Sequence, residues 1–122
     1  MLPRANRLTS GEGFRRTIRS GVRCGAATLV VHWLPGGASD QPAVRVGLVV
    51  SRAVGNSVTR HRVQRRLRHL VADRLDRLAA PSTLVIRALP PAADADSVGL
   101  AKDLDRCLDR VAGTPALERS RA

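Results

Sequence analysis

Apolar residues recur along the chain with two different periods, and these periods predict the order of its elements. Alternation over residues 44–51 places Val44, Val46, Leu48 and Val50 on one face of a predicted strand. Residues 26–34 and 82–89 are rich in β-forming residues and predict two further strands. A polar loop from Pro35 to Pro42 separates the first two strands. We expect those two strands to pair as an antiparallel hairpin with a long, mobile tip.

Helical spacing predicts three helices around these strands. Thr9 and Glu12 have the spacing of a capping box, and their helix would cover residues 10–20 and end at Gly21. Apolar residues three and four apart, from position 63 to position 78, predict a long helix that begins near Ser57 and ends before Pro81. A last helix covers residues 97–111, with Ala101, Leu104, Leu108 and Val111 facing inward. The order α-β-β-α-β-α is typical of an α+β sandwich with helices on a small sheet.

The long helix separates into an apolar side and a cationic side. At 100° per residue, Arg62, Arg65, Arg66 and Arg68 spread over the half opposite the apolar stripe. Six arginines lie between positions 52 and 68, and no acidic residue interrupts them. Arginine forks match phosphate oxygens and stack on bases. Gly55 and Asn56 add backbone N–H groups at the helix N-terminus, where anions bind readily.

Charge is distributed unevenly over the 122 residues. The formal net charge is +11, from 20 arginines and Lys102 against 10 acidic residues. Residues 1–70 hold 13 arginines and two acids, whereas the eight basic and eight acidic residues of 71–122 balance. This asymmetry indicates one binding surface for a polyanion. Because arginine forks suit phosphates and bases, the polyanion that we expect is RNA or DNA. We expect a single domain over residues 1–112 and a disordered tail over residues 113–122.

Candidates for protein-based catalysis are few. None of the three histidines, His32, His61 and His69, has a Cys, Asp or Glu at ligand or triad spacing, so we expect them at the surface or facing RNA. The acids of residues 94–109 fit a solvated helix face. Cys24 and Cys107 are expected as buried or half-buried thiols, with a disulfide left open. No apolar run fits a signal peptide or a membrane span, so we expect a cytoplasmic protein without a membrane partner.

The run from Ser51 to Arg68 resembles the signature of the bacterial ribonuclease P protein subunit. That family carries Val-Gly-Asn-Ala-Val, one variable residue and Arg-Asn-Arg. The corresponding residues here are Val54-Gly55-Asn56-Ser57-Val58, Thr59 and Arg60-His61-Arg62. His61 replaces the central Asn and Gln64 a usual lysine, whose charge Arg66 can restore. Residues 45–51 match the family's central strand, and the resemblance covers about residues 1–111.

The resemblance implies both a fold and a function. The implied fold is α-β-β-β-α-β-α, with one further short strand and a left-handed βαβ crossover around the basic helix, against the general right-handed rule. The implied function is to assist a catalytic RNA that removes the 5′ leader of precursor tRNA. The protein alone would be inactive, and the Mg²⁺ ions of the holoenzyme would be held mainly by RNA.

The resemblance also implies roles for single residues. The contacts to catalytic RNA would come from Arg60, His61, Arg62, Arg65, Arg66 and Arg68, while Arg52 and Asn56 could touch RNA or a hydrated metal. Phe14, Ile18 and Trp33 would line a cleft for the single-stranded leader between the sheet and the first helix, unless they are core residues. The alternatives are a ribosomal or general RNA-binding protein without a processing role, a DNA-binding module and a self-sufficient nuclease. The buried stripe of the helix disfavours DNA, and the lack of a carboxylate or histidine cluster disfavours the nuclease.

Overall fold

A computed structural model describes residues 2–36 and 43–112. Its helices are α1 (Gly11–Ser20), α2 (Ser57–Ala72) and α3 (Ser97–Val111), and its strands are β1 (Val22–Gly25), β2 (Leu29–Pro35), β3 (Val44–Val49) and β4 (Ser82–Ala88). Short 3-10 turns, η1 (Arg4–Asn6), η2 (Leu75–Arg77) and η3 (Pro90–Ala93), complete the order. The order confirms the α+β class and the further short strand. The predictions for the loop tip and for residues 113–122 lie outside the described residues.

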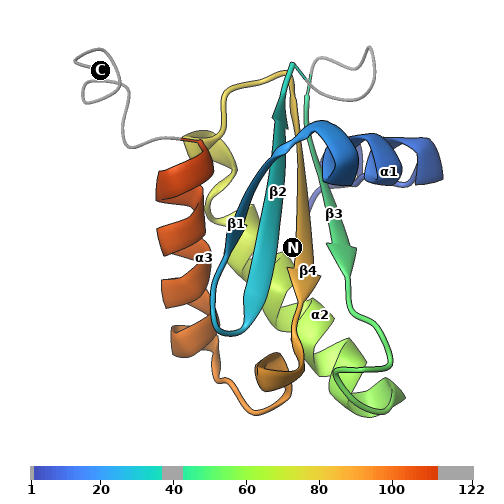
Figure 1. Cartoon of the computed structure of the whole chain (residues 1–122), viewed down its shortest axis with the longest axis vertical. Helices are drawn as coiled ribbons and strands as arrows, with labels where there is room; N and C mark the ends of the chain where they lie inside the picture. Colours follow the sequence, from blue (N-terminus) through green and yellow to red (C-terminus); the bar gives the residue numbers. More distant parts are fainter. Residues whose placement is uncertain (1, 37–42, 113–122) are drawn as a thin grey trace.

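The strands form one sheet in the order β1-β2-β4-β3 (Figure 1). The predicted hairpin of β2 and β3 is therefore wrong, because β4 lies between them, antiparallel to β2 and parallel to β3. Residues 82–86 of β4 are all buried, as expected of a strand covered on both faces. Helix α2 connects β3 to its parallel neighbour β4. The left hand of this crossover stays a prediction.

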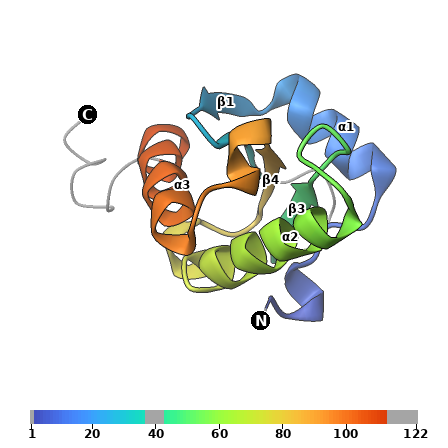
Figure 2. The same cartoon turned by 90° about the horizontal axis from the view of Figure 1, so that it is seen from below.

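Helices cover both faces of the sheet (Figure 2). Helices α2 and α3 pack on one face, where alternate residues of β2, namely Leu29, Val31 and Trp33, belong to the core. Val63 and Leu67 of α2 complete this core, and both are fully buried. The apolar stripe predicted for α2 is thereby confirmed at its centre.

Helix α1 lies on the other face of the sheet. A β-carbon placed at Gly47 of β3 would collide with the Phe14 ring of α1. Glycine at this position therefore lets α1 approach β3 closely, as glycines within strands often do. The same contact brings an aromatic side chain next to the strand that precedes α2.

Two helix ends differ from the prediction. Ser10, rather than Thr9, caps α1, because its Oγ accepts a hydrogen bond from the N–H of Gly13 at 3.2 Å. Glu12 pairs with Arg15 instead of completing a capping box. Helix α2 ends at Ala72, so the apolar residues that follow belong to the turn η2 and its flank. The predicted end of α1 at Gly21 and both ends of α3 are confirmed.

Acidic residues of α3 form hydrogen bonds to other elements of the fold. The prediction that they lie on a solvated face without further contacts is therefore wrong. Asp103 accepts hydrogen bonds from the N–H and the hydroxyl of Thr28 at 3.0 and 2.6 Å. Asp105 accepts two from Arg74, at 2.6 and 3.1 Å, and one from Arg77 at 2.9 Å. The hydrogen bonds from Arg74 hold the pKa of Asp105 below its usual range. Arg77 also donates to Asp109.

The two cysteines are free and buried, in line with the expectation of buried thiols. The Cys107 thiol donates to the backbone carbonyl of Cys24 at 3.4 Å, which links α3 to β1. Burial, together with the neighbouring Cys24, raises the pKa of Cys107 to about 12. A thiol that stays protonated is a poor nucleophile, so its place here is in the packing.

Candidate nucleic-acid interface

The start of α2 is fixed by its own residues. Asn56 is the N-cap, and its Oδ1 accepts a hydrogen bond from the N–H of Thr59 at 2.9 Å. The N–H of Gly55 donates to the carbonyl of Arg52 at 3.2 Å, so the predicted use of that N–H as an anion donor is wrong. The exposed side chain of Arg52 remains beside the helix start.

The arginines of α2 lack acidic partners. Within residues 2–36 and 43–112, no carboxylate forms an ion pair with any of the five, namely Arg60, Arg62, Arg65, Arg66 and Arg68. Arg65 is exposed, and the other four are partly buried. Their charge is thus not neutralised by the described part of the fold. A row of this kind attracts a polyanion.

Two of these arginines have fixed positions, which the sequence did not predict. Arg62 donates to the carbonyl of Ala93 at 3.1 Å, and Arg66 donates to the carbonyl of Ala95 at 2.7 Å. Both acceptors lie in or just after η3, about 30 residues further along the chain. Carbonyl groups hold the side chains in place without cancelling their charge. The two arginines therefore connect α2 to the segment before α3 and still add to the positive surface.

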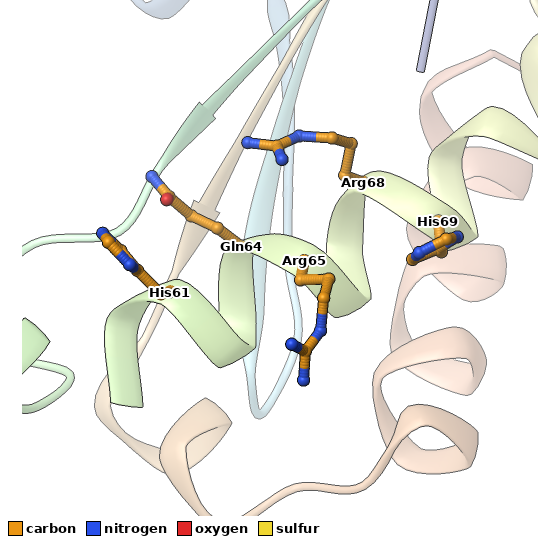
Figure 3. A pocket seen from close by; sticks show the side chains of 5 residues that line it. All are labelled: His61, Gln64, Arg65, Arg68 and His69. Atoms are coloured by element: carbon orange, nitrogen blue, oxygen red, sulfur yellow. The ribbon is translucent and has the colours of Figure 1, made fainter. Parts of the chain in front are cut away.

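The exposed side of α2 carries a depression of about 400 Å³, which we call the α2 hollow. Figure 3 shows the five side chains that line it, His61, Gln64, Arg65, Arg68 and His69. His61, Arg65 and His69 are four residues apart and so follow one face of the helix. Gln64 and His69 were missed as site residues, although this spacing could have found His69. The exposed positions of His61 and His69 agree with the expectation for them.

A smaller groove of about 170 Å³ adjoins the α2 hollow, and we call it the Phe14 groove. Gln64 and Arg68 line both. The rest of the groove comes from the N-terminal segment, α1 and β3, and its lining residues are Leu2, Arg7, Leu8, Thr9, Phe14, Val46, Gly47 and Leu48. The fold thus joins the cationic side of α2 to an aromatic ring on α1.

The three residues expected in a leader cleft lie in different places. Phe14 lines the groove, while Ile18 is 38% exposed further along α1. Trp33 is only 8% exposed and belongs to the core under α2 and α3. Trp33 therefore lies on the sheet face away from α1. The placement of Trp33 in a cleft beside α1 is wrong.

His32 takes the opposite face from Trp33 and is 2% exposed, so the expectation of a surface histidine is wrong for it. Neither ring nitrogen has a hydrogen-bond partner among the described residues. Burial lowers the pKa of His32, and the nearby charges of Arg87 and Arg23 lower it further. Both effects favour the neutral form of the imidazole.

A metal centre built from protein side chains has no candidate in residues 2–36 and 43–112. No group of three or more His, Cys, Asp or Glu residues there could hold a metal ion. No helix in the same ranges is long and apolar enough to cross a membrane.

Comparisons with known proteins agree with this geometry. The family model "Ribonuclease P" matches residues 2–112. The ribonuclease P protein component of Nocardioides sp. is 56% identical over 112 residues, which is 91% of this chain and 95% of the relative. The component of Streptomyces bikiniensis is 51% identical over 120 residues, covering 93% of this chain and 97% of the relative.

Two solved structures share the fold. The RNase P protein of Staphylococcus aureus has a TM-score of 0.75 at 22% identity, over 86% of this chain and 94% of that one. The RNase P protein of Thermotoga maritima has a TM-score of 0.72 at 18% identity, over 86% of this chain and 96% of that one.

Proposed function

Because the chain belongs to the ribonuclease P protein family, we propose that its α2 surface binds the catalytic RNA of ribonuclease P. The chain is the protein subunit of the ribonucleoprotein endoribonuclease that processes the 5′ end of tRNA. The observation that carries the proposal is the row of α2 arginines without a carboxylate partner in the described chain. Each guanidinium that meets a phosphate releases a counterion from the RNA and adds affinity.

The side chains at and near α2 make different contacts with RNA, according to their positions. Arg65 and Arg68, with His61 beside them, line the α2 hollow and meet RNA phosphates there. Arg60, Arg62 and Arg66 add charge from partly buried positions. Arg52 and Asn56 lie at the start of the helix, where the RNA backbone or a hydrated metal held by RNA can approach. We assign no catalytic residue to the protein.

The Phe14 groove receives the single-stranded 5′ leader of precursor tRNA. The Phe14 ring offers a surface on which an unpaired base can stack, and Arg7 and Arg68 at the groove can meet the adjoining phosphates. Ile18 extends the apolar surface along α1. Since the groove shares Gln64 and Arg68 with the α2 hollow, leader and catalytic RNA would meet on one continuous surface.

We propose that the RNA, and not the protein, carries out the cleavage of precursor tRNA. The Mg²⁺ ions that the holoenzyme needs would be held mainly by RNA, and the protein would position RNA and leader. We place the protein in the cytoplasm, where precursor tRNA and the catalytic RNA of a bacterium are found.

Reconstitution tests the proposed function. We expect the purified protein alone to leave precursor tRNA intact, and we expect cleavage at the mature 5′ end when it is added to bacterial ribonuclease P RNA at low Mg²⁺. A general RNA-binding protein would bind the RNA without raising cleavage, and that result would contradict the proposal.

Leader binding needs a separate test. Phe14→Ala should weaken binding of leader-bearing tRNA and leave mature tRNA unchanged, because only the former reaches the groove. Val98→Ala is the matched control, since Val98 is 76% exposed on α3 and lines neither the α2 hollow nor the Phe14 groove. Equal losses for both tRNAs would make Phe14 a packing residue only.

A further inference from the structure

A second depression, also of about 400 Å³, lies between α2 and the first turn of α3, and we call it the α3 hollow. Arg65, Arg66, His69, Leu70 and Ser97 line it. Arg65 and His69 also line the α2 hollow, so the two depressions share a wall. In Figure 3, His69 lies at the opposite end of the row from His61. The surface described above therefore continues beyond Arg68.

The chemistry of the α3 hollow differs from that of the α2 hollow. Leu70 is a partly buried apolar side chain that packs on the core, and Ser97 brings an exposed hydroxyl-bearing residue. The guanidinium of Arg66 is held by the carbonyl of Ala95, so this wall has a fixed position. His69 adds an exposed imidazole. A planar ring, a planar guanidinium and an apolar residue suit the face of a nucleobase.

Two acidic residues lie close in the chain to residues that line the α3 hollow. Asp96 directly precedes Ser97 and caps α3, accepting from the N–H of Gly99 at 2.8 Å. Asp73 caps the end of α2, four residues after His69. Arg65 and Arg66 line the hollow and attract phosphates as well, so charge alone does not select its occupant. The apolar Leu70 favours a base, because its side chain offers a phosphate no hydrogen bond. A volume of about 400 Å³ is within the range of small-ligand sites, about 300–1,000 Å³.

We propose that the α3 hollow binds one unpaired base of the catalytic RNA, stacked on the imidazole of His69. The inference rests on the proposed function, because it takes the α2 hollow as the path of that RNA. A strand whose phosphates meet Arg65 can turn its next base into the α3 hollow, since Arg65 forms part of both walls. His69 then binds RNA by stacking of its ring, whereas the arginines bind it through their charge.

Three substitutions at one position test the proposal. Binding of labelled bacterial ribonuclease P RNA is measured for the wild-type chain and for His69→Ala, His69→Phe and His69→Lys. We expect His69→Ala to lose affinity about fivefold or more, which corresponds to the lower end of base stacking. His69→Phe should keep the wild-type affinity, and His69→Lys should lose it as His69→Ala does. If His69→Lys keeps the wild-type affinity for the RNA and His69→Phe loses it, the residue contacts a phosphate. That result would overturn the proposal.

Chemical probing of base edges gives a second readout. One base of the RNA should be protected by the wild-type protein and by His69→Phe, and should become reactive with His69→Ala. Arg110→Ala serves as the matched control, because Arg110 is exposed on the last turn of α3 and lines neither hollow. Thermal melting of each variant checks that the fold is intact.

Failure of this inference differs from failure of the proposed function. If the wild-type chain binds the catalytic RNA no better than an unrelated structured RNA of the same length, the proposed function fails. If the wild-type chain binds specifically and all three His69 variants equal it, only the base site is overturned.

Discussion

Two groups of arginines lie close together in the chain and have different surroundings. Those of α2, from Arg60 to Arg68, have no ion pair with a described carboxylate, whereas Arg74 and Arg77 are paired with Asp105 and Asp109 of α3. The residue type is the same in both groups. The difference comes from α3, which supplies carboxylates to one group only. Partners, rather than the number of arginines, therefore distinguish a binding surface from a structural contact.

Arg62 and Arg66 are an intermediate case. They are tied to backbone carbonyls, so their positions are fixed as in the paired group, but their charge is retained as in the unpaired group. Fixed cations lose little conformational entropy on binding. The side chains of Arg62 and Arg66 can thus be fixed in position and still be available to bind RNA.

The largest effect should come from a change that disturbs both groups at once. Leu67 is fully buried in the stripe that holds α2 on the sheet. Leu67→Ala should lower the free energy of unfolding by about 2–5 kcal/mol, since it removes buried apolar surface and leaves a cavity. Urea unfolding followed by circular dichroism measures this change. A loss below about 1 kcal/mol would contradict the packing described for α2.

The second largest change in the free energy of unfolding should come from a substitution in the paired group alone. Arg74→Ala removes three hydrogen bonds, two to Asp105 and one to the carbonyl of Leu70. Because Asp105 is partly exposed, we expect a loss of only about 1–2 kcal/mol in the free energy of unfolding. RNA affinity and its salt dependence should stay unchanged. A weaker salt dependence in this variant would assign Arg74 to the RNA surface and break the comparison.

Arg65→Ala should show the reverse behaviour. Arg65 is exposed and has no acidic partner among the described residues, so its removal should change the free energy of unfolding by less than about 0.5 kcal/mol. The slope of log affinity against log salt should become shallower by about 0.7–0.9, the range from single strands to B-DNA for one phosphate contact. Binding titrations at several salt concentrations measure the slope. An unchanged slope would move the RNA contact away from Arg65.

The smallest effect that we expect is a pH dependence of the free energy of unfolding. It comes from His32, which belongs to neither group of arginines. The pKa of His32 is lowered in the folded protein, so the unfolded chain takes up a proton that the folded chain does not. The free energy of unfolding should therefore fall as pH drops below about 6.5, the ordinary value for histidine, until it passes the lower folded pKa. His32→Phe should reduce this fall. Unfolding curves measured from neutral to mildly acidic pH provide the test, and equal slopes for both proteins would contradict it.

The sequence predicted individual elements well because their signals are local. Helical spacing located α3 at both ends, and the apolar stripe located the buried residues of α2. The family resemblance then indicated the further short strand and the function. Each of these conclusions depends on residues within a few turns of one another or on a contiguous motif.

Predictions failed where distant residues meet. Proximity in the chain suggested that β2 pairs with β3, but β4 comes between them from more than 30 residues later. Aromatic character suggested Trp33 for the cleft, although the pleat turns it to the core and turns His32 to the α1 side. The contacts of Arg62 and Arg66 with the segment around η3 have no local signal at all.

The central position of β4 has a consequence for the growing polypeptide. The strand that joins both halves of the sheet is the last of the four to be synthesised, after the whole cationic helix. A nascent chain that stops before residue 82 has β2 and β3 without their shared neighbour. Non-local pairing of this kind slows folding, because distant segments must meet first. During translation the ribosome therefore releases a strongly basic segment before the chain can complete the sheet that supports it.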